Sequence, residues 1–342
     1  MLMSNLLQEM LAERSWLLLD GATGTNLFAM GLMSGEAPEL WNVDAPDKVR
    51  ALYNGFIEAG SDLILTNSFG GSSYRLKLHD AQDRVRELNR AAAELARECA
   101  DAVDHPVVVA GSVGPTGEIM APVGSLSHDD AVAAFREQIA GLMDGGVDVI
   151  WAETISSEEE FRAVAEAAAA EEAPFCGTLS FDTAGRTMMG VTSTAFAGMA
   201  QNAPVPPIGF GANCGTGASD LVRTVLGITE AAPDAIVIAK ANAGIPKYVD
   251  GLIEYDGTPE LMARYACLVR DAGARLIGGC CGTKPEHLVA MKAALETTQR
   301  GQRPSLETIQ AELGAFTSAD DGAGDNPSNE TRGRGRRGRR RG

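Results

Sequence analysis

Three cysteines, Cys214, Cys280 and Cys281, stand where buried strands are predicted to end. Cys280 and Cys281 follow the apolar run 276–279, and Cys214 follows the run 208–213. Three thiolates at ~2.3 Å from Zn2+, with the fourth tetrahedral position open, are typical of a catalytic rather than a structural zinc site. Vicinal cysteines can also form a strained disulfide or fill a glycine-rich turn. The third cysteine at another strand end favours the metal, so we expect one zinc ion per chain.

The other cysteines and the histidines do not extend this set. Cys99 and Cys267 fall within predicted helices and Cys176 within a predicted strand, where a thiol acts as a small hydrophobic side chain. The four histidines lie in loops or at helix starts, and we expect them to be solvated or to cap helices: His79, His105, His128 and His287. A histidine-rich hydrolase site is therefore not expected.

The elements that must position these thiols are short apolar runs and longer amphipathic stretches, which alternate eight times along the chain. Short apolar runs without strict alternation predict strands that are buried on both faces. They cover residues 16–20, 63–67, 107–112, 149–153, 175–181, 208–213, 235–241 and 276–279.

Amphipathic stretches between these runs predict helices with apolar residues at a spacing near 3.6. They cover residues 46–59, 82–102, 129–143, 157–170, 219–229, 259–272 and 285–295, and the fifth crossover, near 192–202, is the least regular. Eight βα units predict a closed (β/α)8 TIM barrel, whose ligand-binding groups lie at the carboxyl ends of its strands. An open doubly wound sheet is the competing fold, but the Gly-x-Gly-x-x-Gly turn expected after its first strand is absent.

The domain organisation follows from where this pattern ends. Residues 1–304 are predicted to form the barrel with a short N-terminal helix, and residues 305–317 a terminal helix. Residues 318–342 lack large apolar side chains and end in an Arg/Gly-rich run, so we expect a disordered tail. Such a tail either is dispensable or binds RNA or another acidic surface.

The charge balance excludes some function classes. The chain carries a formal charge of −17 although seven arginines crowd its last eleven residues, so the rest is more acidic still. An acidic body is not expected to bind nucleic acid, except through the tail. No apolar run is long enough for a membrane span, and the N-terminus does not resemble a signal peptide. We therefore expect a cytoplasmic enzyme with reduced thiols, and barrels of this kind often form homo-oligomers.

Six short stretches together resemble the homocysteine S-methyltransferase family. That family includes the betaine–homocysteine methyltransferases and the homocysteine domain of cobalamin-dependent methionine synthase. The stretches are Asp20-Gly-Ala-Thr-Gly-Thr, Gly60-Ser-Asp-Leu-Ile-Leu-Thr-Asn-Ser-Phe, Gly111-Ser-Val-Gly-Pro-Thr-Gly, Glu153-Thr, Ala212-Asn-Cys-Gly and Gly278-Gly-Cys-Cys-Gly-Thr. The combination of Asn-Cys with Gly-Gly-Cys-Cys-Gly is the specific part of the resemblance, which spans residues 16–297.

The resemblance implies roles for individual residues. Cys214, Cys280 and Cys281 match the zinc ligands of the family, and Asp20 and Glu153 match acids that hold the amino group of homocysteine. Gly21, Thr66, Ser112 and Asn213 fall in segments that line the substrate site. The implied activity is methyl transfer to a zinc-activated homocysteine thiolate, which forms methionine.

The methyl donor is betaine or a methyl-corrinoid on a partner protein, and S-methylmethionine also stays open. Animal betaine enzymes place aromatic residues after the second and fourth strands, where this chain has Gly70 and Thr154. Trp41, Phe69, Tyr74 and Tyr248 remain candidates for a different aromatic cage. Two other functions stay open as alternatives: methyl transfer to another thiol, and a non-catalytic zinc or thiol sensor on the same barrel.

Overall fold

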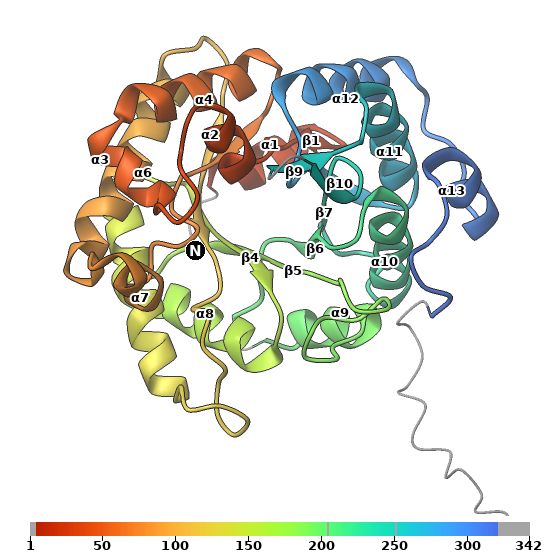
Figure 1. Ribbon diagram of the computed structural model, residues 1–342. Coiled ribbons are helices and arrows are strands. Elements are labelled where there is room, and N and C mark those ends of the chain that lie inside the picture. The colour runs from red at the N-terminus through yellow and green to blue at the C-terminus, as the bar shows by residue number, and fades with distance from the viewer. Residues whose placement is uncertain (1–4, 204, 250–251, 321–342) are drawn as a thin grey trace, which may run out of the picture.

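The computed structural model describes residues 5–203, 205–249 and 252–320. Within these residues, eight parallel strands form one sheet in the order β1-β10-β7-β6-β5-β4-β3-β2, and a bridge between Leu19 and Leu63 joins its two edges. The sheet is therefore a closed barrel, viewed along its axis in Figure 1. The strands are β1 (Leu17–Leu18), β2 (Leu63–Leu65), β3 (Val108–Val113), β4 (Val149–Ile155), β5 (Phe175–Leu179), β6 (Phe210–Cys214), β7 (Val237–Ala241) and β10 (Ala274–Gly279). The predicted (β/α)8 fold is confirmed.

A ring of helices surrounds the barrel, as predicted (Figure 1). These are α4 (Pro46–Glu58), α6 (Val85–Asp101), α7 (His128–Asp144), α8 (Glu158–Ala170), α9 (Ser193–Gln201), α10 (Ala218–Ala231), α11 (Pro259–Asp271) and α12 (Pro285–Thr297). Four of them begin at a Ser or Thr whose side chain accepts a backbone N–H of the first turn: Ser127, Ser157, Thr192 and Thr258. The irregular fifth crossover thus forms a helix that a threonine caps.

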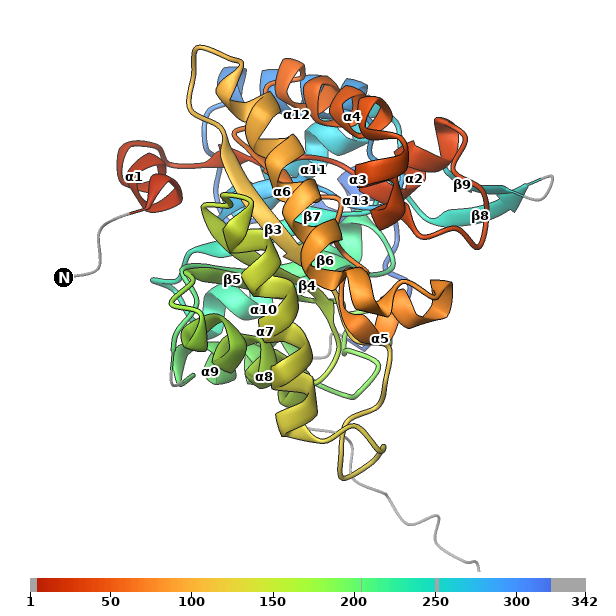
Figure 2. The ribbon, with the colours of Figure 1, turned by 90° about the vertical axis from the view of Figure 1, so that its left-hand side faces the viewer.

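Shorter elements decorate the two ends of the barrel. Helix α1 (Leu6–Glu13) lies at the end where the strands begin, and the hairpin of β8 (Pro246–Val249) and β9 (Leu252–Tyr255) projects from the opposite end (Figure 2). The loops at that opposite end also carry α2 (Thr23–Ala29), η1 (Pro38–Leu40), α3 (Trp41–Asp44), α5 (Ser73–Leu76), η2 (Lys77–His79) and η3 (Gln82–Arg84). The analysis of the sequence did not predict the hairpin.

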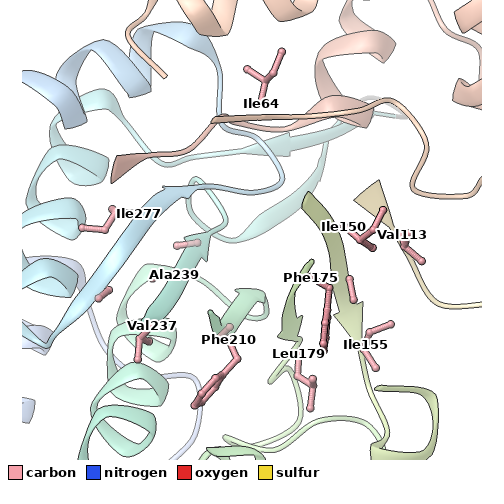
Figure 3. Packing of buried hydrophobic residues seen from close by; sticks show 14 of the residues in the cluster. Ile64, Val113, Ile150, Ile155, Phe175, Leu179, Phe210, Val237, Ala239 and Ile277 are labelled. Carbon is pink, nitrogen blue, oxygen red and sulfur yellow. The ribbon is translucent and has the colours of Figure 1, made fainter. Parts of the chain in front are cut away.

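The apolar side chains pack in two layers because alternate residues of each strand face opposite sides. Leu63, Leu65 and Trp151 point into the barrel, where Leu7 and Leu11 of α1 join them. Ile64 and Ile150, which alternate with these residues, pack outward against the helices in the cluster drawn in Figure 3. Both faces of the strands are therefore apolar, which explains the unbroken apolar runs in the sequence.

The chain after the barrel continues over its outer surface. Helix α13 (Leu306–Leu313) packs beside α10 and α11 and lies within the predicted segment 305–317. From residue 321 onward, the predicted disordered tail, 318–342, lies outside the described residues. None of the helices within the described ranges is both long and apolar enough to cross a membrane.

Candidate metal centre and active site

The structure brings the three predicted metal ligands together at the carboxyl end of the barrel. Their Sγ atoms all lie within 4.8 Å of one another, and those of Cys214 and Cys281 are 3.8 Å apart. Two sulfurs that share a tetrahedral zinc at ~2.3 Å would lie about 3.8 Å apart. The sulfurs of Cys214 and Cys281 are therefore already at the separation expected of two zinc ligands. The sulfur of Cys280 lies within 4.8 Å of both. No other group of three potential ligands meets this distance within the part of the chain that is described.

Local backbone geometry directs Cys214 toward its partners. Cys214 has φ +60° and Gly215 φ +72°, so the chain turns sharply as it leaves β6. A left-handed conformation is costly for a residue with a side chain, and it persists only where its surroundings hold it. The Gly215 N–H donates to Ser180 Oγ at 3.3 Å, and its carbonyl accepts from Asn242 Nδ2 at 2.9 Å. The residues that follow β5 and β7 therefore hold this turn in place.

The other two thiols are held by the neighbouring strand β7. The Cys280 N–H donates to Ala241 O at 2.7 Å, and the Ala243 N–H donates to Cys281 O at 2.9 Å. Gly282, at φ +78°, leaves room for the ring of Tyr255 from the hairpin. The two ends of the metal site, β6 and β10, thus share β7 as a common support.

The three thiols interact directly with one another. Hydrogen bonds from Cys214 and Cys280 lower the pKa of Cys281, and the same hydrogen bonding raises the pKa of Cys214. One thiolate is therefore favoured and three together are not. A metal ion binds cysteines as thiolates, and a divalent cation among the three sulfurs would offset much of their negative charge.

A polar layer of the barrel interior lies next to the thiols, and it follows from the alternation of the strands. On β3, β4, β5 and β7, counting by two from the apolar inner layer leads to a polar side chain near the carboxyl end, and Asn213 of β6 joins them through its hydrogen bond with Thr178. These side chains are Ser112 on β3, Glu153 on β4, Thr178 on β5, Asn213 on β6 and Lys240 on β7. The predicted site residues Ser112, Glu153 and Asn213 belong to this layer.

Lys240 is the member that the sequence analysis missed. Its Nζ lies 2.5 Å from Asp20 Oδ1, and both side chains are 1% exposed. The second carboxylate oxygen of Asp20 accepts the Leu65 N–H at 2.7 Å. Burial raises the pKa of Asp20, and the adjacent Lys240 opposes that shift. Asp20 therefore has a cationic partner within the chain itself.

Glu153 has a neutral partner instead. Its Oε1 accepts a hydrogen bond from Ser112 Oγ at 2.5 Å, and no ion pair to Glu153 is found among the described residues. Loss of hydration raises the pKa of Glu153 to about 7, although the charge of Lys240 acts in the other direction. When both acids are ionised, Asp20, Glu153 and Lys240 together carry one uncompensated negative charge.

Asn213 and Thr154 connect the acid to the thiols. Asn213 Oδ1 accepts from the Thr154 N–H and Thr178 Oγ1, each at 2.8 Å. Its Nδ2 donates to Thr154 Oγ1 at 2.8 Å and to Cys280 Sγ at 3.8 Å. Thr154 has φ +62°, which is rare for a β-branched residue, and Asn213 holds it there. The side chain of Asn213 thus uses its hydrogen bonds to position Thr154, Thr178 and Cys280.

Thr66 and Gly21 complete the predicted set and also serve the scaffold. Thr66 Oγ1 accepts the Ser112 N–H at 2.9 Å and pairs with Ser68 Oγ at 2.6 Å. A Cβ on Gly21 would lie 2.6 Å from Thr283 O, so only glycine lets the first and last strand ends approach this closely. Both residues lie at the mouth, where they hold neighbouring loops together.

Large hydrophobic side chains are exposed in the loops that follow the strands. Ten of the thirteen large hydrophobic side chains that are exposed within the described residues lie in loops at this end of the barrel, which is far from an even spread. These ten residues, named here the apolar rim, are Phe28, Met30, Met33, Val43, Leu78, Ile119, Val123, Met188, Met189 and Ile245. Exposed apolar side chains of this kind are available for contact with a protein or a ligand.

Known proteins are similar to this chain over most of its length. The family model described as homocysteine S-methyltransferase matches residues 17–295. Methionine synthase of Mycobacterium leprae (strain TN) is 30% identical over 329 residues, which cover 89% of this chain and 27% of that protein. Methionine synthase of Mycobacterium tuberculosis (strain ATCC 25618 / H37Rv) is 30% identical over 314 residues, or 85% of this chain and 26% of the relative. The chain thus spans about a quarter of the length of these relatives.

Solved structures superpose with this chain over most of its length. The metallated form of the homocysteine methyltransferase MmuM from Escherichia coli superposes with a TM-score of 0.70 at 25% identity, covering 84% of this chain and 99% of that chain. Its oxidised form superposes with a TM-score of 0.70 at 26% identity, covering 85% and 99%.

Proposed function

Because this chain belongs to the homocysteine S-methyltransferase family, we propose that it methylates the sulfur of homocysteine to form methionine, using a zinc ion held by Cys214, Cys280 and Cys281. The observation that carries this proposal is the meeting of three thiols beside a carboxylate that lacks a cation. A bound Zn2+ would acidify the homocysteine thiol so that its sulfur reacts as a thiolate.

The polar layer supplies a place for the amino group of the substrate. Glu153 and Asp20 contribute two negative charges and Lys240 one positive charge, so one further cation would balance the site. The ammonium group of homocysteine is such a cation, and Glu153 is the acid with a free charge to bind it. Asp20 contributes through its field, since its oxygens already bind Lys240 and Leu65.

The two acids also weigh against the alternatives. A zinc or thiol sensor needs no ammonium site, whereas an amino-acid substrate does. A thiol without an amino group would leave Glu153 without a cationic partner, which is unfavourable for a carboxylate at this depth. Homocysteine therefore remains the best supported acceptor.

For the donor, we propose a methyl-corrinoid carried by a partner protein. The apolar rim supports a protein donor, because exposed apolar side chains around the mouth gain from contact with another surface. An aromatic cage for betaine has less support. Lys48 Nζ already lies 4.2 Å from the ring centroid of Trp41, and Phe69 packs where a Cβ of Gly114 would be. Betaine is the second candidate.

The zinc site is tested by metal analysis of the purified full-length chain. We expect about one zinc per chain, in line with a single three-thiolate site. Cys214→Ala should lose the zinc and the methylation of homocysteine together. Cys267→Ala, a cysteine of α11, is the matched control and should keep both. Full zinc occupancy in Cys214→Ala would refute the ligand assignment.

The donor is tested separately with the zinc-loaded chain and homocysteine. Free methylcobalamin, betaine and S-methylmethionine are supplied in parallel, and methionine is measured. We expect methylcobalamin to support the reaction and betaine to fail. Efficient turnover with betaine would overturn the corrinoid proposal and leave the zinc proposal standing.

A further inference from the structure

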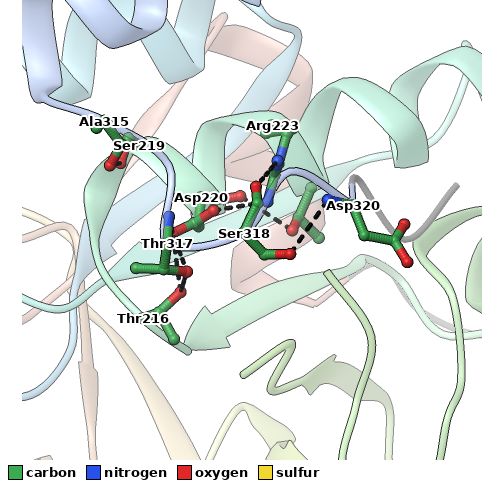
Figure 4. A network of polar contacts seen from close by, with 9 residues as sticks. Thr216, Ser219, Asp220, Arg223, Ala315, Thr317, Ser318 and Asp320 are labelled. Atoms are coloured by element: carbon green, nitrogen blue, oxygen red, sulfur yellow. Dashed lines mark hydrogen bonds and ion pairs between the residues drawn. The ribbon is translucent and has the colours of Figure 1, made fainter. Parts of the chain in front are cut away.

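The C-terminal segment 315–320, named here the C-terminal strap, lies across the start of α10 and next to Thr216 (Figure 4). Its middle residue, Thr317, donates to Asp220 Oδ2 twice, from its hydroxyl at 2.8 Å and from its N–H at 3.1 Å. The Ser219 hydroxyl donates to Ala315 O at 3.4 Å. The strap thus binds the first turn of α10 with both backbone and side-chain groups.

Asp220 joins the strap to the metal-site turn. The same Oδ2 that accepts from Thr317 also accepts from Thr216 Oγ1 at 3.0 Å. Thr216 is two residues from Cys214, and its hydroxyl lies 3.2 Å from that of Thr317. Asp220 is 5% exposed, so its oxygens depend on these partners in place of water.

Arg223 supports the network from the next turn of α10. Its guanidinium pairs with Asp220 Oδ1 at 2.7 Å and donates to Ser318 O at 2.8 Å. It also lies 4.3 Å from the ring centroid of Phe316, within the range of a cation–π contact. The buried charge of Asp220 is therefore compensated, and one arginine holds the two strap residues on either side of Thr317, Phe316 and Ser318.

We propose that the C-terminal strap is a positioning element for the zinc ligand Cys214, with Thr317 and Asp220 as its positioning residues. This inference rests on the proposed zinc site. Cys214 and Gly215 are both left-handed, and such a turn keeps its geometry only through its tethers. The turn is tethered to β5 and β7 through Gly215, and the strap adds the tether at Thr216.

The physical consequence concerns how readily the metal site loses a ligand. Without the strap, the hydroxyl of Thr216 keeps Asp220 as partner and Arg223 still binds Oδ1, but Oδ2 loses its two hydrogen bonds from Thr317. The turn then samples more conformations, and holding Cys214 in the metal-binding one costs more conformational entropy. A more mobile ligand leaves the metal more often, so zinc should dissociate faster.

The test measures zinc release from zinc-loaded, full-length protein to an excess of a chromogenic chelator, without substrate. Thr317→Val removes the hydroxyl at nearly constant volume and should speed release about threefold to tenfold, as expected for one hydrogen bond. Thr216→Val should have a similar effect. The double variant should release zinc no faster than the faster single variant, because both hydroxyls act through one oxygen of Asp220.

The control is Ser318→Ala, which keeps the backbone carbonyl that Arg223 binds and should release zinc at the wild-type rate. Thermal unfolding of each variant is recorded, and Asp220→Asn serves as a second disruption of the network. Faster release at an unchanged unfolding temperature supports positioning over a general loss of stability.

The outcomes separate the two proposals. Wild-type protein that binds no zinc would defeat the proposed zinc site and, with it, the role of the strap. Wild-type protein that binds zinc, together with wild-type release rates in Thr317→Val and Asp220→Asn, would overturn the strap inference alone.

Discussion

At the scale of single residues, the polar groups of the site differ in whether they already have a partner of opposite charge or a full set of hydrogen bonds within the protein. Asp20 and Lys240 form a buried ion pair, and Asn213 forms hydrogen bonds with Thr154, Thr178 and Cys280. Glu153 is different, because its partner within hydrogen-bond distance is the neutral hydroxyl of Ser112. Residues that are similar in the sequence, such as two acids at strand ends, therefore have different roles in the folded chain.

The raised pKa of Glu153 predicts how ligand binding depends on pH. Because desolvation raises this pKa to about 7, Glu153 is largely neutral at pH 6 and ionised at pH 8. An ammonium group binds the ionised form, so affinity for methionine should increase about tenfold between these pH values. Methionine is chosen because it has no thiol to titrate. Calorimetric titration of zinc-loaded protein measures the effect.

Glu153→Gln is the control for this pH dependence. It should bind methionine weakly with little change between pH 6 and pH 8, while zinc content stays at the wild-type value. The same raised pKa means that the ligand-free protein should lose stability as the pH rises through about 7, because folding favours the protonated acid. An equally steep binding profile in Glu153→Gln would show that another group titrates.

At the scale of elements, the close approach of strands β6 and β7 sets the position of Cys214. Gly211 lies in β6 where a Cβ would clash with Ile238 O of β7. A backbone oxygen cannot move away without breaking the pairing of the two strands. The register of β6 and β7, and therefore the distance from Cys214 to the other thiols, depends on this glycine.

Two glycine substitutions should act in opposite directions. Gly211→Ala should destabilise the fold by about 3 kcal/mol or more, because overpacking here separates strands. Gly198→Ala in α9 is the matched change, since a Cβ there would have no atom within 4 Å. It should stabilise by about 0.5–1 kcal/mol, the usual gain for glycine to alanine within a helix. Urea unfolding of both variants measures the difference, and equal effects would contradict the argument.

At the scale of the whole molecule, the barrel is closed by a short seam between its first and second strands. Strand β1 pairs with β10 over two residues, and a single bridge at Leu19 and Leu63 links it to β2. Asp62 reinforces this seam, because its Oδ2 accepts the Leu18 N–H at 2.8 Å and its carboxylate binds Arg14. The mouth of the barrel keeps its shape only while this seam is closed.

Asp62→Ala should therefore weaken the whole fold without altering the metal centre. The change leaves the buried N–H of Leu18 without an acceptor, which costs roughly 1–3 kcal/mol. Asp47→Ala is the control, since this acid is 96% exposed and should change stability by no more than about 0.5 kcal/mol. Chemical unfolding and zinc analysis are the two measurements. A loss of zinc at full stability in Asp62→Ala would contradict this separation.

The amino-acid sequence determined the barrel, the family and the location of the three thiols. The periodicity of apolar residues is a local property, and parallel strands place all their carboxyl ends on one face whatever the details of packing. Cys214, Cys280 and Cys281 could therefore be assigned to one site from strand ends alone. Lys240 was missed, although a charged residue within the apolar strand β7 is an unusual feature of the sequence.

Only the tertiary structure decided which polar groups pair with each other. Asp20 and Lys240 are distant in the sequence, and nothing local to either one predicts their contact. The same holds for the strap, in which Thr317 reaches Asp220 from the end of the described chain. Such pairings depend on the register of the strands and on where α13 packs. These are set by the sum of many weak contacts, so they emerge only when the whole barrel is assembled.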